Sequence, residues 1–187
     1  LVVEVGCSFG GLISSFSAPN VHLVCFEPTP ILAPIAANTL ARSRTAGWQV
    51  FNHSWDPDVA RTLGPIDLFV SSHVVEHIGD PCSFAAELFE MMAPGGVVFT
   101  EVPTYSNFMR ELRVPRFPGG PGQGHYHLTL FTPRGFLILM ESAGFRLGDL
   151  RTVMAVAGTV SINGHFIRSI LFKPHVASVK ARVAGRH

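Results

Sequence analysis

The chain has 187 residues, of which 47% are hydrophobic and 14% are charged, with a formal net charge of +1. These values predict one domain with a substantial buried core and indicate neither a nucleic-acid surface nor an acidic partner. No apolar run approaches the roughly 18 residues that cross a bilayer. Cys7, Cys25 and Cys82 are odd in number and lack C-x-x-C spacing, so the sequence predicts neither a disulfide framework nor a zinc site. We therefore expect a cytoplasmic protein.

The start of the chain carries the pattern around which the rest of the fold is predicted. Residues 1–5 are an apolar, β-branched run, and residues 6–11 are rich in glycine. With Glu4 just before the turn, this pattern predicts a buried parallel strand that presents its backbone to a ligand at its carboxyl end. A second apolar run over 21–27 ends in Glu27, which is the strand-tip position where nucleoside-binding sheets hold the ribose hydroxyls.

Two glycine fingerprints compete for this turn. A dinucleotide-binding G-x-G-x-x-G loop requires glycine at positions 6, 8 and 11, where the chain has Gly6, Ser8 and Gly11. An acidic-x-G-x-G-x-G pattern falls on Glu4, Gly6, Ser8 and Gly10, again with Ser8 as the departure. A short glycine motif is weak evidence, so the turn by itself does not decide between them.

Strand and helix patterns alternate through the next hundred residues. In chain order, the expected elements are a short helix after Gly11, a helix within 28–43, a strand over 48–51, a helical turn over 60–63, a strand over 66–72, a helix from residue 81 and a strand over 97–103. Asp80 is expected to cap the helix that begins at Pro81, and 94–96 to end it. This alternation predicts an open parallel sheet with helices on both faces.

The alternation of strand and helix patterns is absent over 104–131, where a glycine-rich stretch predicts a lid, a binding loop or a disordered segment. A helix is then expected over 133–143, because a threonine cap and a proline precede it and a glycine ends it. Two strands are expected over 146–157 and 165–172, with Asn163-Gly164 as the turn between them.

Four downstream blocks resemble class I S-adenosylmethionine-dependent methyltransferases in order and spacing. They are residues 66–81, 92–103, 127–133 and 141–145, and the acidic-x-G-x-G-x-G pattern is the cofactor loop of that family. The resemblance implies an α/β fold, a Rossmann-like, doubly wound, seven-stranded sheet that is mostly parallel with an antiparallel C-terminal hairpin strand. It implies a methyltransferase domain over 1–174, without the helical cover that usually precedes the first strand, and a polar, basic tail over 175–187.

The resemblance also implies S-adenosylmethionine as the cofactor. Glu4 would orient the methionine amino end, Gly6 and Gly10 would let the backbone approach, and Glu27 would hold the ribose hydroxyls. The other implied contacts are Cys7, Ser8 and Phe9 in the loop, Pro28 beside the adenosine, Ser54, Trp55 or Asp56 near the adenine, and Ser72, His73 and Val74 at the sulfonium end. Glu4 has a structural alternative, as a buried carboxylate bonded to loop amides.

The histidines are candidates for a general base, because an imidazole titrates near neutral pH. His127 matches the family's histidine before a Leu-x-x-Phe-Thr segment and is the candidate catalytic base or substrate contact. His73 and His77 stand four residues apart, but Glu76 lies outside the H-E-x-x-H pattern. The sequence therefore predicts no metal site, and His77 is expected to have a supporting or capping role.

These features predict methyl transfer from S-adenosylmethionine to a small-molecule O, N or C nucleophile. Such an in-line displacement mainly requires that the protein position the reactants and exclude water. We expect no nucleic-acid or membrane partner, and the oligomeric state stays open. Two alternatives also stay open: a nicotinamide-dependent oxidoreductase, and a domain that keeps the fold but only binds a partner.

Overall fold

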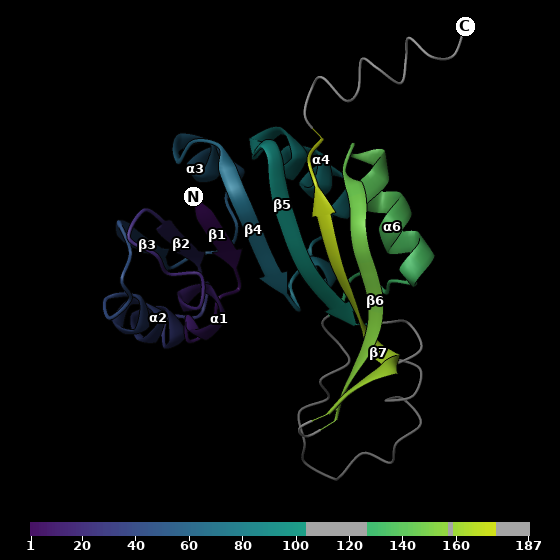
Figure 1. Ribbon diagram of the computed structural model, residues 1–187, viewed down its shortest axis with the longest axis horizontal. Helices are drawn as coiled ribbons and strands as arrows, with labels where there is room; N and C mark the ends of the chain where they lie inside the picture. The colour runs from purple at the N-terminus through teal and green to yellow at the C-terminus, as the bar shows by residue number, and fades with distance from the viewer. Residues whose placement is uncertain (104–126, 157–158, 175–187) are drawn as a thin grey trace, which may run out of the picture.

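A single seven-stranded sheet organises the computed structural model, which describes residues 1–103, 127–156 and 159–174 (Figure 1). The strands are β1 (Val2–Val5), β2 (His22–Phe26), β3 (Gly47–Phe51), β4 (Ile66–Ser72), β5 (Met92–Pro103), β6 (Arg146–Val156) and β7 (Thr159–Phe172), in the order β3-β2-β1-β4-β5-β7-β6. The first five strands are parallel, and β7 runs antiparallel to both β5 and β6. The predicted mostly parallel, Rossmann-like sheet is confirmed.

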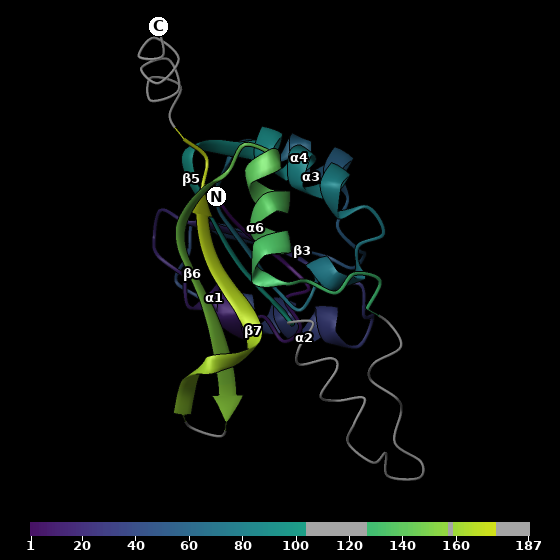
Figure 2. The ribbon, with the colours of Figure 1, turned by 90° about the vertical axis from the view of Figure 1, so that its right-hand side faces the viewer.

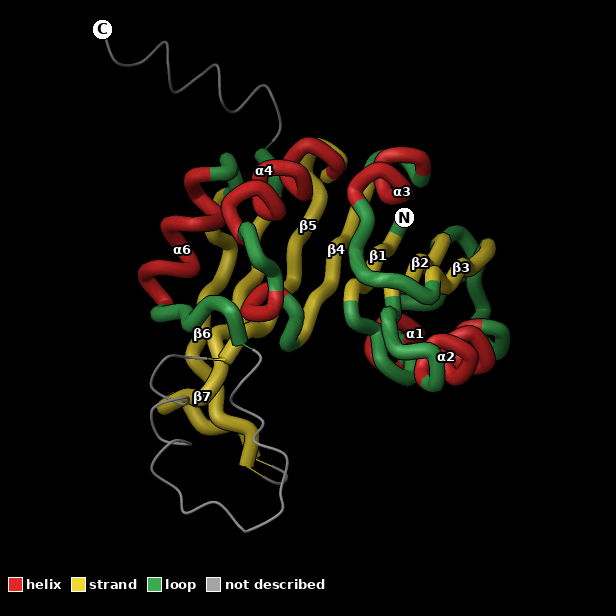
Figure 3. The backbone as a smooth tube through the Cα atoms, turned by 180° about the vertical axis from the view of Figure 1, so that it is seen from behind, coloured by secondary structure: helices red, strands yellow, loops and turns green. Residues whose placement is uncertain are grey.

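Helices cover both faces of this sheet. They are α1 (Gly11–Ser14), α2 (Leu32–Leu40), α3 (Pro57–Thr62), α4 (Pro81–Met91) and α6 (Pro133–Ser142), with a 3-10 turn η1 (Val75–His77) after β4. Figures 2 and 3 show α4 and α6 side by side. None of the helices in the described part of the chain has the length and apolar character that crossing a bilayer requires.

Strand β1, which lies between β2 and β4, is buried on both of its faces. Val3 and Val5 belong to the larger core cluster, together with Phe84 of α4, whereas Val2 belongs to a second cluster with Ile13 of α1. Successive side chains of a strand point to opposite faces of the sheet. A strand covered by helices on both sides must therefore be apolar at consecutive positions, as the start of this chain is.

Aspartate and threonine caps define the helix starts as predicted. Asp80 Oδ1 accepts hydrogen bonds of 3.0 and 3.1 Å from the backbone N–H groups of Ser83 and Cys82, and these bonds lower the pKa of Asp80 because they favour its ionised form. Thr132 Oγ1 accepts a 3.0 Å bond at the start of α6. Asp56 caps α3 in the same way, so this candidate for the adenine site has a structural partner instead.

The predicted helix stop at 94–96 is wrong. Helix α4 ends at Met91, and residues 94–96 lie within β5. The Gly95 N–H donates a 2.8 Å hydrogen bond to the carbonyl of Lys173, and the Lys173 N–H donates a 2.9 Å bond to the carbonyl of Gly96. This pairing with the chain beyond β7 holds the Pro-Gly-Gly stretch in the sheet.

The predicted turn at Asn163-Gly164 is also wrong. Both residues lie within β7, and the two terminal strands part between Val156 and Thr159. In the β6–β7 ladder, Val153 pairs with residue 166 whereas Met154 pairs with residue 161. The Asn-Gly signal therefore falls on a break in the ladder rather than on the connection between the strands.

Cys7 and Cys25 form a disulfide, contrary to the sequence prediction, and their Cα atoms are 5.9 Å apart. Parallel pairing places Glu4 of β1 opposite Cys25 of β2, and the turn after β1 brings Cys7 beside it. A separation of 18 residues carries no local signal, because the β1–α1–β2 crossover alone brings the two thiols together. Cys82 is free and exposed. The cytoplasmic location stays a prediction.

The expected lid and the candidate tail fall on residues 104–126 and 175–187, which lie outside the described residues. His125, a further histidine that the sequence offers as a candidate general base, and the basic residues of the tail also lie outside the described residues. The division of the chain into a domain over 1–174 and a tail stays a prediction.

Candidate functional site

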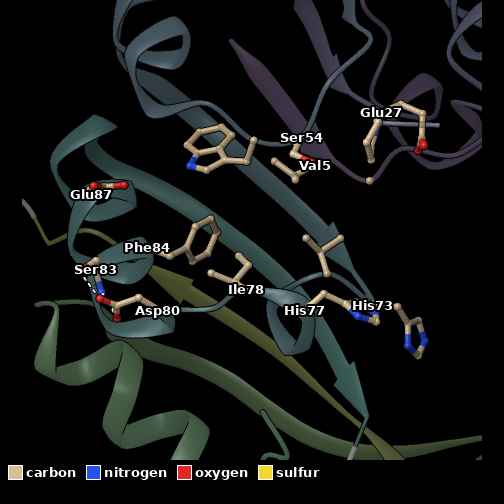
Figure 4. A pocket seen from close by; sticks show the side chains of 14 residues that line it. Val5, Glu27, Ser54, His73, His77, Ile78, Asp80, Ser83, Phe84 and Glu87 are labelled. Carbon is tan, nitrogen blue, oxygen red and sulfur yellow. Dashed lines mark hydrogen bonds between the residues drawn. The ribbon is translucent and has the colours of Figure 1, made fainter. Parts of the chain in front are cut away.

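A cavity of about 590 Å³ opens at the carboxyl ends of the parallel strands (Figure 4). Seven of the predicted cofactor residues line it, namely Gly6, Glu27, Pro28, Ser54, Trp55, His73 and Val74. The cavity continues past His77 and Ile78 to Phe84 and Glu87 of α4. Strand β1 lies between β2 and β4, so the connections leave the sheet in opposite directions here. This is the position where open α/β sheets bind their ligands.

The two glycines of the turn are required by close contacts. Gly6 has a φ of +69°, and a Cβ at this position would lie 2.6 Å from Val74 Cγ2. The Gly6 N–H donates a 2.8 Å hydrogen bond to the carbonyl of Phe26 at the end of β2. Gly10 has a φ of +74°, and its Cβ would lie 3.2 Å from the Cα of Ala36 in α2. The turn therefore runs too close to its neighbours to carry side chains at these positions.

Ser8 occupies the second glycine position of the motif with a glycine-like backbone. Its φ is +51°, in the left-handed region that L-residues seldom adopt. The Ser8 N–H donates a 2.8 Å hydrogen bond to Glu27 Oε2. The departure from the motif therefore changes the residue and preserves the path of the loop.

Glu27 is buried at the tip of β2, where the second apolar run predicts it. Its Oε2 accepts the bond from Ser8, and its Oε1 accepts a 2.8 Å bond from the Thr29 N–H. A carboxylate has about four lone-pair sites, so each oxygen retains acceptor capacity. Because Glu27 also lines the cavity, this capacity is available to a donor such as a ribose hydroxyl.

Glu4 is buried and does not line the cavity. Its Oε2 accepts a 2.9 Å hydrogen bond from the Ile13 N–H of α1, which is the loop-amide contact of the structural alternative. Burial raises the pKa of Glu4 from 4.5 to about 7, the Ile13 bond opposes this rise, and the charge of Glu27 adds to it. Glu4 thus supports the turn through its hydrogen bond to α1 and not by lining the cavity.

The remaining predicted residues are not among those that line the cavity. These are Cys7, Ser8, Phe9, Gly10, Ser72 and His127. Cys7 is held in the disulfide, and the side chain of Phe9 is 57% exposed. His77 lines the cavity although the sequence suggests only a supporting role. Its position after β4 is a signal that could have found it, because that strand ends at the cavity.

His127 reaches this region through backbone contacts. The N–H groups of Leu128 and Thr129 donate bonds of 2.8 and 3.1 Å to the carbonyl of Glu76 in η1. These bonds place the His127 ring 4.9 Å from that of His77, centroid to centroid. His127 therefore lies one side chain away from the cavity.

A family model described as a methyltransferase domain matches residues 2–149, which include the turn, the cavity wall and helix α6. The chain belongs to this methyltransferase family. The methyltransferase domain is 24% identical over 162 residues to the C-methyltransferase NovU of Streptomyces niveus, covering 87% of this chain and 36% of that protein. It is 29% identical over 100 residues to a ubiquinone biosynthesis O-methyltransferase of Aromatoleum aromaticum, covering 52% and 42% respectively.

Solved methyltransferases share the fold of this domain. An S-adenosylmethionine-dependent methyltransferase of Clostridium acetobutylicum superposes with a TM-score of 0.71 at 10% identity, covering 92% of this chain and 83% of that one. S-adenosylmethionine is the cofactor of this family of enzymes. The methyltransferase domain spans 36% and 42% of the length of the two curated relatives above.

Proposed function

We propose that this domain transfers the methyl group of S-adenosylmethionine to a small-molecule O, N or C nucleophile. The observation that carries this proposal is the cavity that Gly6 and Glu27 share at the switch point of the sheet. A buried carboxylate with spare acceptor capacity, next to a turn that a Cβ would block, fits a ribose diol beside a closely approached backbone. The residues present therefore fit the cofactor.

Different lining residues contact different parts of the cofactor. Glu27 accepts hydrogen bonds from the ribose hydroxyls, and Pro28, Ser54 and Trp55 border the adenosine. His73 and Val74 follow β4 and face the sulfonium end. The other predicted residues, Glu4, Cys7, Ser8, Phe9, Gly10 and Ser72, shape the turn and the strand ends that carry these contacts.

The cofactor supplies an electrophilic methyl carbon. S-adenosylhomocysteine would be the product that leaves after the transfer. The chain has to hold the nucleophile, the methyl carbon and the sulfur in line and to exclude water. Where the nucleophile has to lose a proton, His77, which lines the cavity, and its neighbour His127 are the candidate imidazoles.

The size of the cavity supports a small acceptor. About 590 Å³ lies within the range of small-ligand sites, and the part beyond His77 is bordered by Ile78 and Phe84. One relative above is a C-methyltransferase and the other an O-methyltransferase. Carbon and oxygen nucleophiles are therefore the first acceptors to test, with a partly apolar skeleton.

Calorimetric titration with S-adenosylhomocysteine tests the cofactor site, with NAD as the parallel ligand. We expect saturable binding of S-adenosylhomocysteine only, weakened at least tenfold in Glu27→Gln. Glu141→Gln, an exposed carboxylate on α6, is the matched control and should bind like the parent. Binding of NAD alone would favour the oxidoreductase alternative, and equal binding by Glu27→Gln would remove Glu27 from the site.

A further inference from the structure

Glu76 in η1 is a buried carboxylate whose surroundings are incomplete. Its side chain is 0% exposed, and among the described residues neither carboxylate oxygen has a hydrogen-bond partner. Burial of a carboxylate that accepts no hydrogen bond is costly. A buried polar group of this kind in a native protein indicates that an ion, a water or a ligand completes its environment.

Two histidines lie next to this carboxylate. His77 follows Glu76 in η1, and the bonds from Leu128 and Thr129 to the Glu76 carbonyl bring His127 to the same place. One ligand atom each from Glu76, His77 and His127 lie within 4.8 Å of one another. The Nδ1 atom of His127 is also buried without a hydrogen-bond partner among the described residues.

We propose that Glu76, His77 and His127 bind a divalent transition-metal ion. Two imidazoles and one carboxylate are a donor set that suits Zn²⁺, Fe²⁺ or Mn²⁺. Bond lengths of roughly 2.0–2.2 Å to such an ion require the ligand atoms to approach to roughly 3.3 Å of one another. The three side chains start within 4.8 Å, so small side-chain rotations complete the site.

The proposed ion lies beside the sulfonium end of the cavity, next to the part beyond His77 that is proposed for the acceptor. His73 and His77 line the cavity at the end away from Glu87 (Figure 4), and His73 Nδ1 is 3.4 Å from Glu76 Oε1. Three protein ligands leave at least one coordination position open. That position can hold an oxygen atom of the acceptor beside the sulfonium end. This role rests on the proposed methyl transfer, whereas the metal site itself does not.

Metal binding can be measured without any acceptor. The full chain is stripped with EDTA, dialysed and titrated calorimetrically with ZnCl₂ and with MnCl₂, and the absorption bands of a Co²⁺-loaded sample report the ligand geometry. We expect one saturable site per chain. Its affinity should fall at least tenfold in Glu76→Gln and in His127→Ala. The controls are Glu90→Gln on the exposed face of α4 and His22→Ala on β2, and both should bind like the parent.

Thermal unfolding shows which variants fold. The metal should raise the Tm of the parent and of both controls, and should leave the Tm of Glu76→Gln unchanged. S-adenosylhomocysteine binding should persist in every variant that folds. Absence of that binding in the parent, with metal binding retained, would count against the proposed function and not against the metal site. Absence of saturable metal binding by the parent, or unchanged affinity in Glu76→Gln, would overturn the metal site.

Discussion

The backbone N–H of Ser8 donates a 2.8 Å hydrogen bond to Glu27 Oε2 and so joins the turn after β1 to the tip of β2. Glu27 also accepts the Thr29 N–H at 2.8 Å. One buried carboxylate therefore holds two loops in place and faces the cavity. Stability and cofactor affinity should depend on it together.

Replacement of Glu27 by alanine should destabilise the domain by about 1–3 kcal/mol, because two backbone N–H groups lose their acceptor. Glu27→Gln retains one carbonyl oxygen and should lose less. Urea denaturation of both variants measures the two losses. Equal stability of the parent and Glu27→Ala would show that water replaces the carboxylate at no cost.

Replacement of Ser8 by glycine should raise the free energy of unfolding by up to about 1 kcal/mol. The φ of +51° at Ser8 is unfavourable for a residue with a Cβ atom, and glycine adopts it without this penalty. Ser8→Val should lower the free energy of unfolding, since a β-branched residue tolerates this conformation least. Thermal unfolding of the pair gives the order, and a less stable glycine variant would contradict the strain.

Gly6→Ala should destabilise the domain by more than about 1 kcal/mol, because its Cβ would lie 2.6 Å from Val74 Cγ2 at a φ of +69°. Truncation of the neighbour in Gly6→Ala/Val74→Ala should recover the part of the loss that comes from the contact. A double-mutant cycle on urea denaturation separates that part from the backbone strain. A coupling energy near zero would mean that the contact contributes nothing.

The raised pKa of Glu4 predicts a pH dependence of stability. Between the unfolded value of 4.5 and the folded value of about 7, the folded state binds more protons than the unfolded state. The free energy of unfolding should therefore fall as the pH rises through this window, by at most about 3 kcal/mol. Urea denaturation from pH 4.5 to pH 8 measures the slope, and Glu4→Gln should flatten it. An identical slope in the variant would assign the effect to other groups.

Reduction of the Cys7–Cys25 disulfide should destabilise the domain by about 3 kcal/mol, the value typical of a loop of this length. It should also weaken S-adenosylhomocysteine binding, since Cys7 is part of the turn. Thiol titration of the unreduced, unfolded chain should count one thiol, Cys82, and none in Cys82→Ser. Three reactive thiols in the parent would show that the disulfide does not form under the conditions of purification.

The sheet and the position of the glycine turn after β1 could be predicted from local patterns in the sequence. Consecutive apolar residues in 1–5, glycine at Gly6 and a carboxylate at Glu27 are local patterns, and each is required by its own strand or turn. The caps at Asp80 and Thr132 belong to the same class, because a cap contacts only the next three residues. Such features can be predicted because the residues that interact are neighbours in the chain.

Contacts between residues far apart in the chain could not be predicted in this way. The disulfide depends on the pairing of β1 with β2, and the cluster of Glu76 and His127 depends on backbone bonds between segments about fifty residues apart. The wrong turn at Asn163-Gly164 has the same origin, since its local preference yielded to the register of β6 and β7. Contacts of this kind follow from how the strands pair and the crossovers return, and no spacing in the chain encodes them.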